Sequence, residues 1–222
     1  MILADEINRA PAKVQSALLE AMAERQVTIG GKTYPLPELF LVMATQNPIE
    51  QEGTYPLPEA QLDRFLMYVK IGYPEAKVEH DILALARKEA LGLAGGKKDK
   101  VVKLTQKTLF EARRHVLKVH TSDALENYLV QLVVATRNPG AYSEELGRWL
   151  RFGASPRATI ALDRCSKAHA WLAGRDYVTP DDIHAIAHDV LRHRVLMSFE
   201  AEAEGITSDD FIDSLLRLVA IP

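Results

Sequence analysis

The stretch Ile2-Leu3-Ala4-Asp5-Glu6-Ile7-Asn8-Arg9-Ala10-Pro11 decides the fold class of this sequence. Its apolar start runs directly into two carboxylates, a pattern that indicates the end of a buried strand in an α/β sheet. Ligands of open α/β sheets bind beyond the carboxyl ends of the strands. At such an edge Asp5 can hold Mg²⁺, and Glu6 can activate a water molecule as a general base. Two solvated acids at a strand end are the simpler interpretation of this dipeptide taken alone.

The residues that follow predict further elements of an α/β domain. Pro11 in a first turn, followed by apolar residues at helical spacing, predicts a helix over residues 11–24. Its apolar stripe consists of Val14, Leu18 and Met22, together with Ala17 and Ala21. Two β-prone runs around Gly30-Gly31 predict a hairpin over residues 26–34. The apolar run 39–45 predicts a fully buried strand of a parallel sheet.

A change of pattern near residue 74 predicts two domains. A short helix over 59–65 and a strand over 66–71 precede Gly72-Tyr73-Pro74, which breaks the chain. Beyond this point apolar residues recur at helical spacing, and capping side chains mark where helices begin. The predicted caps are Thr105, Ser122, Ser155, Thr179 and Ser208. We therefore predict a fragment of an α/β domain over residues 1–74 and an all-helical domain over residues 75–222.

Three further polar residues occupy places that suit phosphate chemistry. Asn47 follows the strand over 39–45, Arg64 lies near the end of a short helix, and Arg157 falls in the first turn of a capped helix. Each has a plainer interpretation when taken alone. These are a turn at Asn47-Pro48, a structural pair of Asp63 with Arg64, and a surface arginine. Together with the two acids, they supply the metal ligand, oriented water and cationic charge that phosphoryl transfer needs.

Composition limits the other classes of protein. The 222 residues are 47% hydrophobic and 26% charged, which is typical of a globular chain. The single cysteine, Cys165, excludes an intramolecular disulfide and a cysteine-rich zinc site, and it fits a reducing compartment. No apolar run is long enough for a transmembrane helix. His184 and His188 stand four residues apart, but a packed or solvated helix face is a likelier role for them than a metal site.

In this order and spacing, the motifs resemble those of MoxR-type AAA+ ATPases. The similarity covers nearly the whole chain and is most specific over residues 2–74. Its segments are Ile2 to Pro11 as the Walker B region, Gln15 to Met22, Glu24 to Thr28, Ala44 to Pro48, Glu59 to Phe65, and Gly153 to Ala158 as sensor 2. The resemblance implies an α/β fold, with a partial AAA+ P-loop NTPase core followed by an all-α lid domain. The core would hold a parallel sheet with helices and a β-hairpin insertion, the hairpin at Gly30-Gly31 facing the pore of a ring.

The resemblance also implies roles for five residues. Asp5 and Glu6 would lie at the Mg²⁺ site, where Asp5 holds the metal and Glu6 activates water. Asn47 would be sensor 1, and Arg64 would be the arginine finger that reaches the ATP of a neighbouring subunit. Arg157 would be sensor 2, which contacts the γ-phosphate. Whether Arg157 acts within its own subunit or across the interface stays open at this point.

The sequence departs from the family in one respect, because it contains no Gly-x-x-x-x-Gly-Lys-Ser/Thr phosphate loop. The nearest segment, Gly95-Gly96-Lys97-Lys98, has the wrong spacing, lacks Ser or Thr after the lysine and follows a predicted helix. Such a loop supplies the backbone N–H groups and the lysine that bind the phosphates. We therefore expect the chain to be the C-terminal portion of a longer ATPase and to be inactive on its own.

The family further implies a cytoplasmic, ATP-driven ring, a hexamer, that remodels or matures client protein complexes with a von Willebrand factor A domain partner. Two alternatives stay open. One is a non-catalytic interaction module with a vestigial ATPase site. The other is a DNA-associated AAA+ protein, which would bind DNA in a salt-dependent manner through the basic cluster between Arg87 and Lys118. The net charge of −3 makes nucleic acid the less favoured partner.

Overall fold

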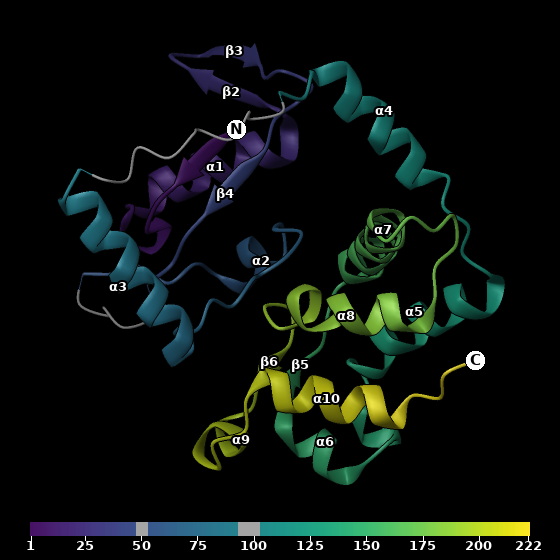
Figure 1. Cartoon of the computed structure of the whole chain (residues 1–222). Helices are drawn as coiled ribbons and strands as arrows, with labels where there is room; N and C mark the ends of the chain where they lie inside the picture. Colours follow the sequence, from purple (N-terminus) through teal and green to yellow (C-terminus); the bar gives the residue numbers. More distant parts are fainter. Residues whose placement is uncertain (48–52, 93–102) are drawn as a thin grey trace. The chain divides into compact units, whose positions relative to one another are not determined.

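The computed structural model describes residues 1–47, 53–92 and 103–222. The chain divides into two compact units. One joins Met1–Tyr68 to Arg114–Pro222, and the other consists of Val69–Arg113. Figure 1 gives the labels of the helices and strands. The α/β class with a parallel strand pair, a hairpin and a helical C-terminal part is confirmed. The boundary after Pro74 stays a prediction.

The parallel strands are shorter and more exposed than the sequence predicts. Strand β1 (Ile2–Ala4) pairs with β4 (Val42–Ala44), and Leu3 stands opposite Met43. Ala4 and Ala44 pack toward a small core around Ile7, Leu19 and Leu57. Leu3 and Met43 point to the other face and are more than half exposed, because no described element of this unit covers that face. The prediction of a fully buried strand over 39–45 is therefore wrong.

Helix α1 (Ala12–Glu24) forms where it is predicted, and its predicted stripe faces the small core except at Val14 and Ala17. Its buried residues are Gln15, Leu19 and Ala21, whereas Val14 is 53% exposed. The Gln15 side chain is accommodated because its amide donates to the carbonyls of Ile7 (3.2 Å) and Tyr55 (3.0 Å). Leu18 and Met22 of the predicted stripe also pack against the small core.

The predicted hairpin is confirmed. Strands β2 (Gln26–Ile29) and β3 (Lys32–Pro35) pair antiparallel around Gly30-Gly31. Both glycines have positive φ (58° and 77°), the conformation that a tight two-residue hairpin turn needs and that glycine adopts without strain.

Residues 66–71 do not form the predicted strand. They follow helix α2 (Glu59–Leu62) as irregular chain. The carbonyls of Leu66 and Tyr68 accept hydrogen bonds from arginine side chains, and the Tyr68 amide donates to the carbonyl of Asp189 (2.7 Å). These groups are therefore already paired, and none of the strands within residues 1–47, 53–92 and 103–222 pairs with this segment.

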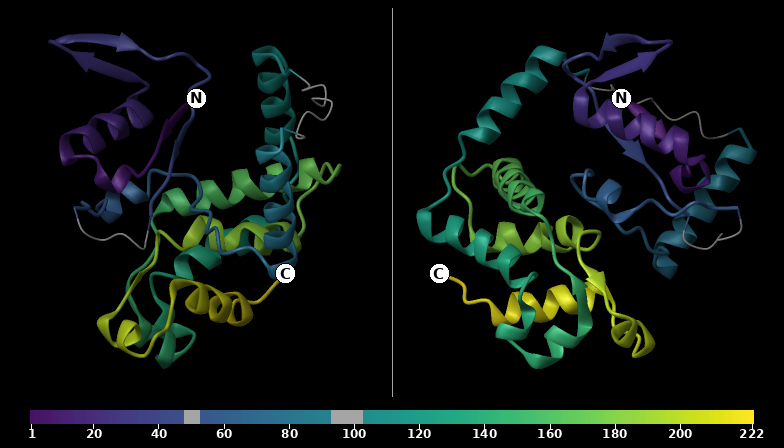
Figure 2. Two further views of the ribbon diagram at one scale, coloured as in Figure 1. Left: turned by 60° about the vertical axis from the view of Figure 1, so that its left-hand side comes forward. Right: turned by 180° about the vertical axis from the view of Figure 1, so that it is seen from behind.

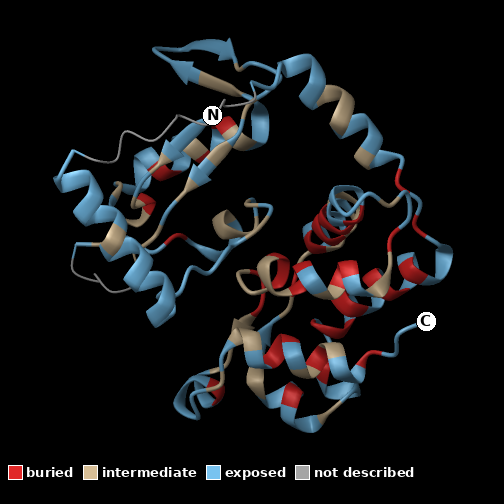
Figure 3. Cartoon of the chain, viewed as in Figure 1, coloured by how far each residue is buried: buried red, intermediate tan, exposed pale blue. Residues whose placement is uncertain are grey.

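The C-terminal part of the larger unit is built from helices around one core. They are α5 (Asp123–Ala135), α6 (Glu144–Trp149), α7 (Pro156–Leu172), α8 (Pro180–Leu191), α9 (Phe199–Ala203) and α10 (Ser208–Leu218). Figure 3 shows the buried residues along the inner faces of α5, α7, α8 and α10. Helices α7 and α8 lie side by side (Figure 2). Fully buried side chains such as Leu132, Leu162, Ile183 and Phe211 fill the space between the helices.

Local signals place most of these helix starts correctly. The Ser122 and Ser155 hydroxyls accept from backbone N–H groups of their helices, and Thr179 forms a capping box with Asp182. The last helix is capped by Thr207, not by Ser208 as predicted. The sequence also gave no signal for the antiparallel pair of β5 (Leu150–Phe152) and β6 (Leu196–Met197), whose strands are only two or three residues long.

The smaller unit holds helix α3 (Ala76–Ala90) and the start of α4 (Gln106–Leu117). None of the residues of α3 is buried. Gly95-Gly96-Lys97-Lys98, together with part of the basic cluster, lies outside the described residues. None of the helices in the described ranges is both long and apolar enough to span a lipid bilayer.

Candidate functional site

Thr45, at the end of β4, joins this strand to the end of β1, where the candidate acids Asp5 and Glu6 lie. Its hydroxyl donates to the Asp5 carboxylate (2.5 Å) and accepts from the Glu6 backbone N–H (2.9 Å). Its backbone N–H donates to the Ala4 carbonyl (3.0 Å), and its carbonyl accepts from the Ile7 N–H (2.9 Å). The parallel pairing of β1 with β4 therefore brings Asp5 and Glu6 together with the chain that leads to Asn47, which is partly buried two residues farther on.

Glu6 is held in an uncommon backbone conformation. Its φ and ψ are 47° and 54°, in the left-handed region, and the short helix η1 (Ile7–Arg9) follows directly. For a residue with a side chain, this conformation costs about 1–2 kcal/mol. Backbone strain of this kind gathers at functional sites. The Glu6 carboxylate pairs with Arg9 Nε through one of its two oxygens, at 2.8 Å.

The acids at this edge fit a Mg²⁺ ion that is completed by phosphate. Mg²⁺ usually takes one or two carboxylates and fills its other positions with water and substrate phosphate oxygens. Asp5 is exposed, and Thr45 fixes its carboxylate through one oxygen. Among the described residues, no group of three or more His, Cys, Asp or Glu side chains could hold a metal ion. The donor set therefore suits a metal that arrives with a nucleotide.

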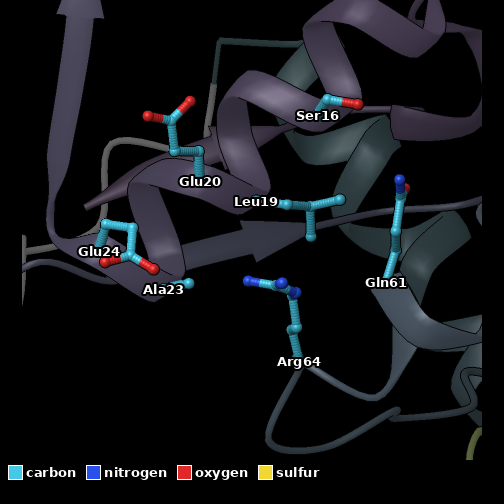
Figure 4. Close-up of a pocket in the computed structure, with 7 residues that line it drawn as sticks. All are labelled: Ser16, Leu19, Glu20, Ala23, Glu24, Gln61 and Arg64. Carbon is cyan, nitrogen blue, oxygen red and sulfur yellow. The ribbon is translucent and has the colours of Figure 1, made fainter.

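Arg64 lies in a pocket between α1 and the end of α2. The pocket has a volume of about 290 Å³. Its lining residues are Ser16, Leu19, Glu20, Ala23, Glu24, Gln61 and Arg64, as Figure 4 shows. The Arg64 guanidinium points toward α1, where Glu20 and Glu24 supply negative charge. Because Arg64 is exposed, its guanidinium is accessible to a phosphate carried by another molecule.

Arg157 meets the residue that precedes Arg64. One oxygen of the Asp63 carboxylate accepts from Ser155 Oγ (2.8 Å) and from Arg157 Nη1 (3.2 Å). The other oxygen accepts from Arg194 Nε (3.0 Å). Burial raises the pKa of Asp63, but the hydrogen bonds from Ser155 and Arg157 and the charge of Arg194 outweigh it and leave the pKa below its usual value.

Three consecutive basic residues after α8 fix the chain around Arg64. Arg194 donates to the carbonyls of Asp63, Phe65 and Leu66. Arg192 donates to the Tyr68 carbonyl (2.7 Å), and His193 Nε2 donates to the Phe65 carbonyl (3.2 Å). Burial, helped by the charge of Arg194, lowers the pKa of His193 to about 4, so this ring is neutral near pH 7.

The sequence did not indicate that Asp63 and Arg194 matter. Each residue nevertheless occupies a position in the sequence that could have indicated its role. Asp63 directly precedes the candidate finger, and Arg194 ends the basic run Arg192-His193-Arg194. Their contact spans 131 positions of the chain, so no local pattern reveals it.

The histidines on α8 have separate partners. His184 Nε2 bonds the Tyr128 hydroxyl (2.8 Å), and His188 Nε2 lies 3.0 Å from the Asp213 carboxylate. Cys165 is buried, as expected, and burial raises the pKa of its thiol to about 11.

Two family models match this chain. The model described as "ATPase family associated with various cellular activities (AAA)" matches residues 1–67, and the one described as "AAA lid domain" matches residues 148–215. The chaperone MoxR1 of Mycobacterium tuberculosis is 45% identical over all of this chain and 57% of its own length. The protein MoxR of Paracoccus denitrificans is 33% identical over 98% of this chain and 66% of its own length.

A solved structure agrees with these matches. A crystal structure from Cytophaga hutchinsonii, assigned as an ATPase, superposes with a TM-score of 0.87 at 48% identity, over 100% of this chain and 66% of its own. The chain thus spans roughly three-fifths to two-thirds of the length of the relatives that it matches.

Proposed function

Because the chain belongs to the MoxR-type AAA+ ATPases, we propose that it carries the hydrolytic half of an ATPase site and the arginines that complete the site of a neighbouring copy. The observation that carries this proposal is the position of Thr45. Its hydroxyl bonds both the Asp5 carboxylate and the Glu6 backbone at the ends of two parallel strands. This is the edge of an α/β sheet where ligands bind.

The residues at this edge divide the chemistry of hydrolysis. Asp5 and Glu6 would lie at a Mg²⁺ ion that enters with ATP, and the ion would neutralise charge on the phosphates. Glu6 would take the proton of the attacking water. Asn47 would bind the γ-phosphate or orient that water through its amide.

The phosphate loop is proposed to come from outside these 222 residues, since the sequence has no Gly-x-x-x-x-Gly-Lys-Ser/Thr. Without its backbone N–H groups and lysine, the phosphates lose most of their binding contacts. The 222-residue chain alone is therefore expected neither to bind ATP tightly nor to hydrolyse it.

Arg64 and Arg157 are proposed to act on the same nucleotide, bound by the neighbouring copy. The Asp63 carboxylate accepts from Arg157 at 3.2 Å and belongs to the residue directly before Arg64. Two guanidinium groups that reach one nucleotide would suit the charge that develops on a transferring phosphoryl group. This arrangement favours action of Arg157 across the subunit interface, the alternative that the sequence left open.

At the level of the whole protein, we propose a hexameric ring in the cytoplasm that couples ATP hydrolysis to remodelling or maturation of protein complexes. The name of the M. tuberculosis relative, a chaperone, supports this direction. A von Willebrand factor A domain protein is the proposed partner. The client complex would supply the substrate on which the ring acts.

The test is ATP hydrolysis by an assembly that includes the phosphate loop. We expect Glu6→Gln and Arg64→Ala each to lower turnover at least a hundredfold. Glu126→Gln and Arg217→Ala, which change exposed residues of α5 and α10, serve as matched controls and should keep wild-type turnover. Wild-type rates in Glu6→Gln would refute the proposal.

A further inference from the structure

The Asp63 carboxylate accepts hydrogen bonds from three side chains, whereas an ion pair needs only one partner. It is one carboxylate between two arginines, and a serine hydroxyl also donates to it. The two arginines differ in their surroundings. The Arg194 side chain is 2% exposed and the Asp63 side chain 13%, whereas the Arg157 side chain is 58% exposed. The same carboxylate therefore has a buried partner and an exposed partner.

The buried partner fixes the carboxylate. Arg194 donates to Asp63 and also to four backbone carbonyls, those of Asp63, Phe65, Leu66 and Val190. Removal of one member of a buried ion pair shifts a folding equilibrium by at least about a hundredfold, because the other charge is left uncompensated. Asp63 thus has a fixed place, and it satisfies Arg194 whether or not Arg157 is bound.

The exposed partner can leave at little cost. Arg157 contacts Asp63 through a single Nη1 to Oδ2 distance of 3.2 Å, and its own side chain is 58% exposed, so this contact is weaker than the buried one with Arg194. The two arginines exceed the one carboxylate by a unit of positive charge. A phosphate that approaches this edge therefore meets an arginine that is already oriented, incompletely neutralised and weakly held.

We propose that Asp63 is a positioning residue of the ATPase site. It holds the guanidinium of Arg157 next to the chain segment that carries Arg64 and releases it to the phosphate of the neighbouring copy, while Arg194 keeps the carboxylate in place. Ser155 takes part because its hydroxyl donates to the same oxygen of Asp63 and also caps the helix that carries Arg157. This inference rests on the proposed function, in which both arginines act across an interface.

The experiment mixes two impaired variants in one ring, in the assembly that includes the phosphate loop. Asp63→Asn subunits keep Glu6, and Glu6→Gln subunits keep Asp63. In a random equal mixture, about a quarter of the head-to-tail interfaces join an intact Glu6 to an intact Asp63. We expect Asp63→Asn alone to lower kcat at least tenfold with KM for ATP changed less than threefold, and the mixture to regain about a quarter of the wild-type rate.

A reference mixture of Glu6→Gln with Arg64→Ala tests the proposed function separately from the inference about Asp63. If this mixture stays inactive, action across the interface is wrong, and the inference fails with it. If it regains activity but the mixture with Asp63→Asn does not, the proposed function stands and Asp63 is only a structural residue. A wild-type kcat for Asp63→Asn also overturns the inference.

A second variant keeps the test decisive if Asp63→Asn subunits do not fold. Ser155→Ala leaves the buried pair of Asp63 with Arg194 intact and removes a hydroxyl that both orients Asp63 and caps α7. Thr207→Ala removes a comparable cap from α10 and controls for the loss of the cap. We expect kcat to fall about three- to tenfold in Ser155→Ala and to be unchanged in Thr207→Ala. Equal rates in the two variants would overturn the inference.

Discussion

Replacement of Gly153 by alanine tests how closely the segment before α7 packs against α5. A Cβ added at Gly153 would lie 2.1 Å from the carbonyl oxygen of Thr136, 2.5 Å from its carbon and 2.8 Å from the Arg137 nitrogen. All three are backbone atoms, so no side chain can move aside. The backbone must separate by more than an ångström to reach ordinary van der Waals contact.

The expected loss follows from the contacts that this shift breaks. Overpacking alone costs about 1–3 kcal/mol. The shift also weakens two hydrogen bonds, from the Ala154 N–H to Thr136 Oγ1 (2.9 Å) and from Arg137 Nε to the Ala154 carbonyl (2.8 Å). At about 1 kcal/mol each, these bring the expected loss in free energy of unfolding to about 4 kcal/mol.

The assay is equilibrium urea unfolding of the 222-residue chain, followed by far-ultraviolet circular dichroism, with two glycines as internal controls. A Cβ at Gly140 meets its nearest atom at 3.9 Å, so Gly140→Ala should lie within about 0.5 kcal/mol of wild type. A Cβ at Gly147 meets the Gly140 backbone at 3.1 Å, which predicts an intermediate loss of about 1–2 kcal/mol. A loss below 1 kcal/mol in Gly153→Ala, or a reversed order of the three variants, would refute the packing argument.

Three further predictions concern the site and the core. Thr45→Val should lower Mg²⁺-dependent ATP hydrolysis by the assembly with the phosphate loop about 10–100-fold, and Thr45→Ser should restore it; unchanged turnover in the valine variant would remove Thr45 from the site. The folded-state pKa of His193, about 4, lies below the unfolded value of about 6.5, so the unfolded state binds the extra proton first as pH falls. Stability should therefore decrease by up to roughly 3 kcal/mol from pH 6.5 to 4, and urea unfolding of His193→Gln over this range should show a shallower slope. Cys165, buried and with a pKa of about 11, should react with a thiol reagent only as fast as the chain unfolds; rapid labelling in buffer would show that the core opens locally.

Signals that act over a few residues predicted most of the fold. The Gly30-Gly31 turn, the Ser122 and Ser155 caps and the Thr179 capping box each depend on neighbours within four positions. The edge with Asp5 and Glu6 was also predictable, because parallel strands end at a common edge whatever their separation in sequence. The roles of the five candidate residues stay predictions.

The errors arise where distant residues decide the outcome. Residues 66–71 have the composition of a strand, but Arg192 and Arg194, more than 120 positions away, bind their carbonyls. Val14 lies on the predicted apolar stripe of α1 but is 53% exposed, because the small core around Ile7 and Leu57 reaches only Leu18, Met22 and Ala21 of that stripe. Thr207 and Ser208 are both capping residues, so sequence alone does not choose between them.

The basic run after α8 has a consequence for how freely this protein can change. Arg192, His193 and Arg194 donate hydrogen bonds to main-chain carbonyls within residues 65–68. Every amino acid has such a carbonyl, so these bonds do not depend on which side chain an exposed residue such as Leu66 carries. Substitutions of exposed residues in 65–68 should therefore leave this segment hydrogen-bonded to residues 192–194. Proline is the exception at Tyr68, whose N–H is already donated to Asp189.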